Sequence, residues 1–134
     1  MSAQDFLTRF EQEYCLGVDT MDETHRQFLN QVAAACAADK AGFAGAMQQL
    51  FNHTQAHFAD EEASMSRIGH AAMAEHVADH QRILGDMDRF NERVAAGRHT
   101  MARAWVADSL LQWFHTHAQT MDSALAAELK AEQG

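Results

Sequence analysis

The sequence predicts an all-α protein, an up-down-up-down four-helix bundle with an N-terminal arm. Its 134 residues contain no proline, the strongest helix breaker, and are rich in helix-favouring Ala, Leu, Met, Gln and Glu. Four stretches carry apolar residues at helical spacing, and glycine-containing segments separate them. The length fits one domain, with residues 1–17 as the arm and 18–131 as the bundle.

The first helix is expected over residues 19–38 and the second over residues 41–68. Asp19, Thr20 and Asp22 are available to cap the start of the first helix. Side chains three and four residues apart share one face of a helix, and an apolar face should turn inward. The inward residues are His25, Leu29, Val32 and Cys36 on the first helix, and Met47, Leu50, Thr54, His57, Glu61 and Met65 on the second.

The third helix is expected over residues 70–96 and the fourth over residues 101–130. The third helix has the most regular spacing of apolar residues along the chain. Its inward residues are Met73, His76, His80, Ile83, Met87, Phe90 and Val94, and those of the fourth are Val106, Leu110, Trp113, His117, Met121 and Leu125. The apolar residues of the arm, which are Phe6, Leu7, Phe10 and Tyr14, are expected to pack across one end of the bundle.

Charge and cysteine usage exclude several classes of protein. The net charge of -9 repels phosphate backbones and anionic lipid, which argues against nucleic acid and membrane partners. No apolar run approaches the roughly 18 residues that span a bilayer, and residues 1–10 do not resemble a signal peptide, so a cytoplasmic protein is expected. Cys15 and Cys36 form no CxxC pair and are expected to be buried or bystander thiols.

Histidines are the most informative residues, because every predicted inward face contains at least one. Glu61 follows His57 by one helical turn, so polar groups from all four helices converge on one layer of the core. Burying these groups without partners would cost several kcal/mol each. The pairs His57 with Glu61 and His76 with His80 place their donors about 6 Å apart on one helix face, a spacing that suits a shared metal ion or adjacent ions.

A single His-x-x-x-His pair is weak support for a metal site. Nine histidines in this chain produce such pairs by chance, and His53 with His57 is another. A lone histidine on an apolar face is more often a hydrogen-bonded core residue than a ligand. The convergence of all four helices on one layer is what favours a metal centre.

Four segments carry a resemblance to a known family. They are Gly17 to His25 (GVDTMDETH), His57 to Glu62 (HFADEE) with Met65, His76 to His80, and Trp113 to His117 with Asp122. Together they closely resemble the hemerythrin family, in particular the single-domain bacteriohemerythrins. The resemblance covers nearly the whole chain from Gly17 onward, and the segments occur in the family's order.

The resemblance implies an oxygen-binding protein rather than an enzyme, with no catalytic residues. Two non-haem iron ions would be bridged by Glu61, Asp122 and an oxo or hydroxo group. One iron would take His76, His80 and His117, and the other His25 and His57. These ligands leave one position for dioxygen, on the iron held by His25 and His57. Phe28, Leu29, Trp113 and Phe114 are candidates for the wall of the dioxygen pocket.

The donor set also separates this chain from other di-iron proteins. Ferritin-like oxidases use Glu-x-x-His motifs, and this sequence has none. Imidazole-rich coordination keeps ferrous iron accessible, and a dry apolar pocket hinders loss of peroxide, which together favour reversible binding. The implied roles are oxygen transport, storage or sensing, with dioxygen as ligand and a protein that receives oxygen as a further partner; a monomer is expected.

Asp122 is the proposed ligand that spacing supports least. A step of five residues from His117 turns about 140° around an ideal α-helix, so the family pattern and not the periodicity selects it. The chain also departs from the family pattern near the site. Tyr14, Thr24, Ala118 and Leu125 stand where Trp, Gln, Ile and Tyr are frequent, and these changes remove bulk or a hydroxyl.

The remaining polar residues receive simpler interpretations. His70 and His99 fall at helix boundaries and are expected to be solvated, as are Asp60 and Glu62. His115 should point away from the site. His53 lies one turn from His57, and the sequence leaves open whether it packs, is exposed or lies beside the site.

Two other functions fit the same residues. The di-iron site could act as a redox enzyme, namely an oxidase, a peroxidase or a consumer of nitric oxide. Alternatively, labile metal could be the working feature of an iron-handling protein. Sustained consumption of peroxide or nitric oxide would favour the first, and rapid exchange of metal with a chelator would favour the second.

Overall fold

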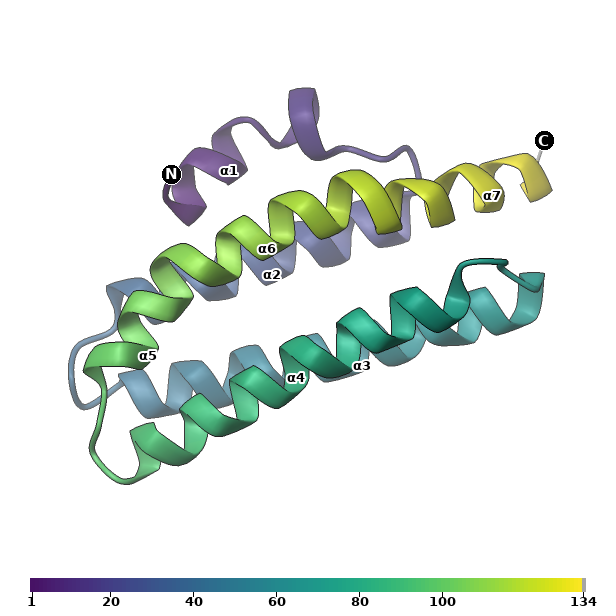
Figure 1. Cartoon of the computed structure of the whole chain (residues 1–134). Coiled ribbons are helices and arrows are strands. Elements are labelled where there is room, and N and C mark those ends of the chain that lie inside the picture. The colour runs from purple at the N-terminus through teal and green to yellow at the C-terminus, as the bar shows by residue number, and fades with distance from the viewer. Residues whose placement is uncertain (134) are drawn as a thin grey trace.

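The computed structural model describes residues 1–133 and confirms the predicted all-α bundle (Figure 1). Four long helical segments run alternately up and down, and the arm lies outside them. No β-strand occurs in residues 1–133. In chain order the elements are α1 (Ala3–Thr8), the π-helical turn η1 (Phe10–Tyr14), α2 (Asp19–Ala37), α3 (Phe43–Ile68), α4 (Met73–Ala95), α5 (Thr100–Ala104), the π-helical turn η2 (Trp105–Ser109), α6 (Leu110–His117), the π-helical turn η3 (Ala118–Asp122) and α7 (Ser123–Gln133).

The helix boundaries agree with the expected ones to within three residues. At the end of α3, Gly69 adopts a φ of 64°, a left-handed conformation that glycine takes without strain. The N–H of His70 then donates to the carbonyl of Met65 at 2.9 Å. Helix α4 begins at Met73 and not at His70, because a turn closed by the Met73 N–H and the His70 carbonyl precedes it.

The expected caps of the first helix do not form. Val18 occupies the capping position of α2, and no side chain caps this helix end. The buried carboxylate of Asp22 instead accepts hydrogen bonds from the backbone N–H groups of Leu16 at 2.8 Å and Gly17 at 3.1 Å, and from the Cys15 thiol. Asp22 therefore fixes the segment that joins the arm to the bundle.

The arm lies along the side of α2 and α6 (Figure 1), so the expectation that it crosses one end of the bundle is wrong. Phe6 and Tyr14 stack with their ring centroids 5.1 Å apart, and both contact Phe114 of α6. The Tyr14 hydroxyl and Nδ1 of His115 share a hydrogen bond of 2.8 Å. Because Phe114 and His115 lie midway along the last long segment, these contacts hold the arm against its flank.

Two apolar clusters fill the bundle, and the predicted polar layer lies between them. The larger contains residues such as Leu29, Phe58 and Ile83, and the smaller includes Met65 and Leu125. On each long segment the histidines occupy positions between residues of the two clusters. The chain thus places its polar groups deep inside the bundle, where solvent cannot pair them.

Two inward assignments are wrong, those of Cys36 on the first helix and Met121 on the fourth. Met121 is half-buried and lines a surface hollow, while its neighbour Asp122 is buried. Cys36 is exposed, and Ala35 faces the core in its place. Measured from Val32, Cys36 lies about 40° to one side around the helix and Ala35 about 60° to the other, so a modest rotation of the buried face exchanges the two. Neither cysteine forms a disulfide. Within residues 1–133, no helix has the length and hydropathy needed to cross a membrane.

Replacing Asp22 with Ala should lower the free energy of unfolding by about 1–3 kcal/mol, because two half-buried backbone N–H groups lose their acceptor. Denaturant unfolding monitored by circular dichroism measures this loss. Asp19→Ala is the matched control, since it removes the same charge from the same helix end. It should cost less than about 1 kcal/mol. Equal losses in the two variants would contradict the anchoring role of Asp22.

Candidate metal centre

All seven residues expected at the site converge on one buried layer. Helix α2 contributes one of them, α3 and α4 contribute two each, and the last segment contributes two. Their side chains face the middle of the bundle, and none is more than 8% exposed. They are His25, His57, Glu61, His76, His80, His117 and Asp122.

The imidazoles form two sets around the carboxylate of Glu61. Its Oε2 atom lies 2.5 Å from Nε2 of His57 and 3.7 Å from Nε2 of His25. Its Oε1 atom lies 3.2 Å from Nε2 of His80 and 3.4 Å from Nε2 of His76. One carboxylate therefore directs one oxygen toward each set.

Asp122 repeats this arrangement from the opposite side of the bundle. Its Oδ2 atom lies 3.1 Å from Nε2 of His25, while Oδ1 lies 3.1 Å from Nε2 of both His76 and His117. Both carboxylates thus stand between a two-histidine set and a three-histidine set. Such an arrangement suits two adjacent cations that share the carboxylates.

A π-helical turn explains how Asp122 reaches the layer. The turn η3 spans Ala118–Asp122, and the Ser123 N–H that follows it bonds back to the carbonyl of Ala118, five residues earlier. In a π-helical turn, residues five positions apart lie near the same face of the helix, as residues four positions apart do in an α-helix. The 140° displacement expected for an ideal α-helix is thereby reduced, and Asp122 faces inward with 1% exposure.

The charges of the layer stabilise one another. Burial raises the pKa of Glu61 and Asp122, but the surrounding imidazoles outweigh burial and hold the pKa of each carboxyl below its usual value. Burial likewise lowers the pKa of His25 and His76, but the two adjacent carboxylates prevail and raise both to about 9. Without a metal at neutral pH, these two histidines carry protons that balance the carboxylates.

Several polar atoms of the layer have no hydrogen-bond partner among residues 1–133. They include Nε2 of His25, Nε2 of His80, Oε1 of Glu61 and Oδ1 of Asp122. Unpartnered atoms this deeply buried would each cost about 1–3 kcal/mol. Imidazole nitrogen and carboxylate oxygen are donors for first-row transition metals, so the residues present fit a metal centre.

Two acidic residues orient histidines of the layer, and the sequence did not reveal either. Nδ1 of His117 donates to Oδ2 of Asp79 at 2.8 Å, and the Trp113 indole donates to the same oxygen. Nδ1 of His80 donates to Glu62 at 2.9 Å. Glu62 is therefore half-buried and bonded, which corrects its assignment to a solvated surface. Such partners fix the ring orientation and tautomer of a metal-binding histidine.

The four remaining histidines lie outside the layer, as expected, but two are not solvated. His70 is buried and donates to Glu128 of α7 at 2.9 Å. His99 is half-buried against the ring of Phe43. His115 is exposed and bonds to the arm. His53 donates to the carbonyl of Thr24 at 3.4 Å, so packing describes it best.

Two cavities adjoin the layer from different sides. One is apolar, about 10 Å³, and lies beside His25 and His57. Its aromatic lining includes Phe28, Trp113 and Phe114, three of the four expected wall residues. Leu29, the fourth, is fully buried and does not line this cavity. The other cavity has both polar and apolar lining residues, which include Thr24 and Leu125, two of the departures from the family pattern.

Comparison with known proteins identifies the family. Residues 16–129 match the family model described as the hemerythrin HHE cation-binding domain. The chain belongs to the hemerythrin family. It is 29% identical over 119 residues to a bacteriohemerythrin of Ralstonia nicotianae, an alignment that covers 89% of this chain and 85% of that protein.

A second bacteriohemerythrin and a solved structure are also similar to this chain. A bacteriohemerythrin of Stenotrophomonas maltophilia is 24% identical over 120 residues, which is 87% of this chain and 77% of that protein. A solved crystal structure of a leucine-to-phenylalanine mutant superposes with a TM-score of 0.76 and covers 87% of this chain and 92% of that one. At 21% identity, the last comparison supports the hemerythrin-like fold alone.

Replacing Asp79 with Asn should lower metal affinity by about 10- to 100-fold, because the His117 ring loses its charged partner. Competition with a chelator of known affinity measures this change. Asp86→Asn is the control on the same helix, since its carboxylate pairs with arginines and not with the layer. Equal affinities in the two variants would contradict an orienting role for Asp79.

Proposed function

We propose that this hemerythrin-family protein binds dioxygen reversibly at a non-haem di-iron centre and does not turn it over. The proposed ligands of one iron are His76, His80 and His117, and those of the other are His25 and His57. Glu61 and Asp122 would bridge the irons together with an oxo or hydroxo group. The observation that carries this proposal is that each carboxylate directs one oxygen to each histidine set.

The donor set supports reversible binding over oxidation. Five neutral imidazoles and two carboxylates give less negative charge than a carboxylate-rich site, so ferrous iron stays accessible. Ferrous iron supplies the electrons that dioxygen takes up when it binds. The protein's contribution is to hold the histidines in fixed orientations, which Asp79 and Glu62 support.

The apolar cavity supports the same proposal. It borders both histidines of the two-histidine set, together with His117 and Asp122; its exposed lining is mainly apolar, and it is hardly larger than one water molecule. A small dry space admits a neutral diatomic molecule and hinders the water and protons that release peroxide. The rings of Phe28 and Phe114 stack with centroids 5.3 Å apart, and contacts with the arm hold Phe114 in place.

We further propose that the protein carries, stores or senses dioxygen in the cytoplasm as a monomer. Its two free cysteines suit a reducing compartment. Among the described residues, the exposed large apolar side chains are those of Met1 and Met101. Two such side chains do not make the extended apolar patch that a dimer interface usually buries, which supports a monomer.

Admitting oxygen to the anaerobically reduced, iron-loaded protein should produce a visible charge-transfer band that disappears when oxygen is removed. Absorption spectroscopy over repeated cycles tests this expectation. Irreversible conversion to a diferric spectrum would contradict reversible binding and favour a redox enzyme. A protein that stays colourless would contradict the di-iron centre.

Replacing Glu61 with Ala should lose most of the bound iron, because both histidine sets lose a shared carboxylate. Iron content per chain after reconstitution is the measurement. His115→Ala is the control, since His115 bonds to Tyr14 and stays outside the layer. Retention of two irons by Glu61→Ala would contradict the proposed bridge.

A further inference from the structure

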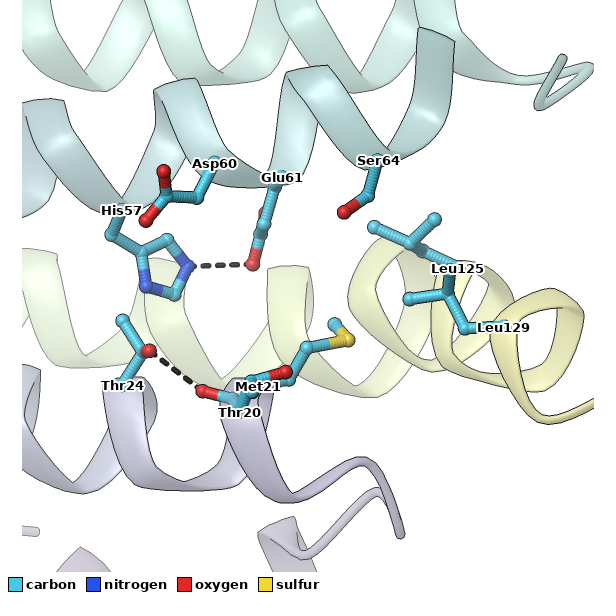
Figure 2. A pocket seen from close by; sticks show the side chains of 9 residues that line it. All are labelled: Thr20, Met21, Thr24, His57, Asp60, Glu61, Ser64, Leu125 and Leu129. Carbon is cyan, nitrogen blue, oxygen red and sulfur yellow. Dashed lines mark hydrogen bonds and ion pairs between the residues drawn. The ribbon is translucent and has the colours of Figure 1, made fainter. Parts of the chain in front are cut away.

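A cavity of about 90 Å³ with both polar and apolar lining residues opens between α2, α3 and α7 and reaches the metal centre (Figure 2). Its lining residues are Thr20, Met21, Thr24, His57, Asp60, Glu61, Ser64, Leu125 and Leu129. We propose that this access cavity is the passage through which divalent metal ions reach and leave the centre. The inference rests on the proposed function only in requiring that the layer binds a cation.

The proposed ligands nearest solvent form the floor of the access cavity. His57 is 8% exposed and Glu61 is 5% exposed, whereas the other five are between 0% and 3% exposed. In Figure 2 both side chains extend from α3 toward the cavity. Glu61 also carries a buried oxygen, Oε1, without a hydrogen-bond partner among the described residues. An incoming ion would therefore meet an ionised carboxylate and an imidazole first.

The polar part of the lining suits a hydrated cation, whereas Met21, Leu125 and Leu129 form its apolar part. Asp60 is exposed on the α3 side of the cavity, and the hydroxyls of Thr20, Thr24 and Ser64 line its walls. No lysine or arginine contributes to the lining. Oxygen atoms of the polar side chains can replace the water ligands of the ion one at a time. The ion therefore does not have to cross apolar surroundings without ligands. A negatively charged mouth also raises the local concentration of cations.

The other openings near the centre are less suited to cations. The apolar cavity is about 10 Å³ and walled by aromatic rings, so a hydrated ion does not fit. A surface hollow beside His117 is lined by Arg82, whose positive guanidinium bonds to Asp79. Asp79 is already engaged by Trp113 and His117, and no free carboxylate faces the ion there. The access cavity therefore combines depth, negative charge and open space.

Rates of metal loading and removal test this proposal without any oxygen chemistry. Metal-free protein is mixed with Co²⁺ in a stopped-flow instrument, and visible absorption follows coordination; EDTA then removes the metal. Ser64→Leu fills the passage and should slow loading and removal by the same factor. The equilibrium dissociation constant should stay unchanged, because a passage alters rates and not the bound state. Ser66→Leu is the control, since Ser66 is exposed on the same helix and outside the lining.

A charge variant tests the mouth of the access cavity independently. Asp60→Asn should slow loading about threefold at low ionic strength, the effect of one carboxylate on a divalent ion across water. This difference should shrink as salt is added. Asp88→Asn removes the same charge from an exposed site on α4 and should load at the unsubstituted rate.

The outcomes separate this proposal from the one on which it rests. Co²⁺ binding with unaltered rates in both Ser64→Leu and Asp60→Asn would overturn the passage and leave the metal centre intact. If Ser64→Leu fails to fold, the salt-dependent slowing of Asp60→Asn decides the matter. Failure of the unsubstituted chain to bind Co²⁺ would overturn the centre itself and the passage with it.

Discussion

Two carboxylates, Glu61 and Asp122, are buried side by side in the middle of an apolar bundle, and five imidazoles surround them. Like charges this close repel, so the layer is stable only if positive charge lies between or beside them. Without a metal, protons on His25 and His76 supply that charge. With two cations, the same atoms can become ligands. The rest of the fold serves to hold this layer together.

Each side of the layer has a different character. On one side, aromatic rings supported by the arm line a small, mainly apolar cavity, which suits a neutral gas. On the other side, hydroxyls and Asp60 line a wider opening, which suits ions. Gas and metal would thus use separate routes to one centre. This separation would allow metal to be loaded without opening the space in which dioxygen would bind.

Regular helical periodicity made most of the fold and site predictable. All six inward residues assigned to the second helix are buried, because α3 is a regular helix with one apolar face. Asp122 could not be found this way, since the π-helical turn that rotates it inward leaves no mark in the apolar spacing. Asp79, Glu62 and His70 were missed for another reason. Their hydrogen-bond partners lie on other helices, and the spacing of residues along one helix gives no information about distances between helices.

The central claim is that the two carboxylates are shared between two metal ions. Anomalous X-ray diffraction from crystals of the iron-loaded protein, collected at the iron absorption edge, tests it most directly. The account predicts two peaks in the layer, one beside His25 and His57 and the other among His76, His80 and His117, with Glu61 and Asp122 between them. A single peak, or iron bound elsewhere on the chain, would contradict it.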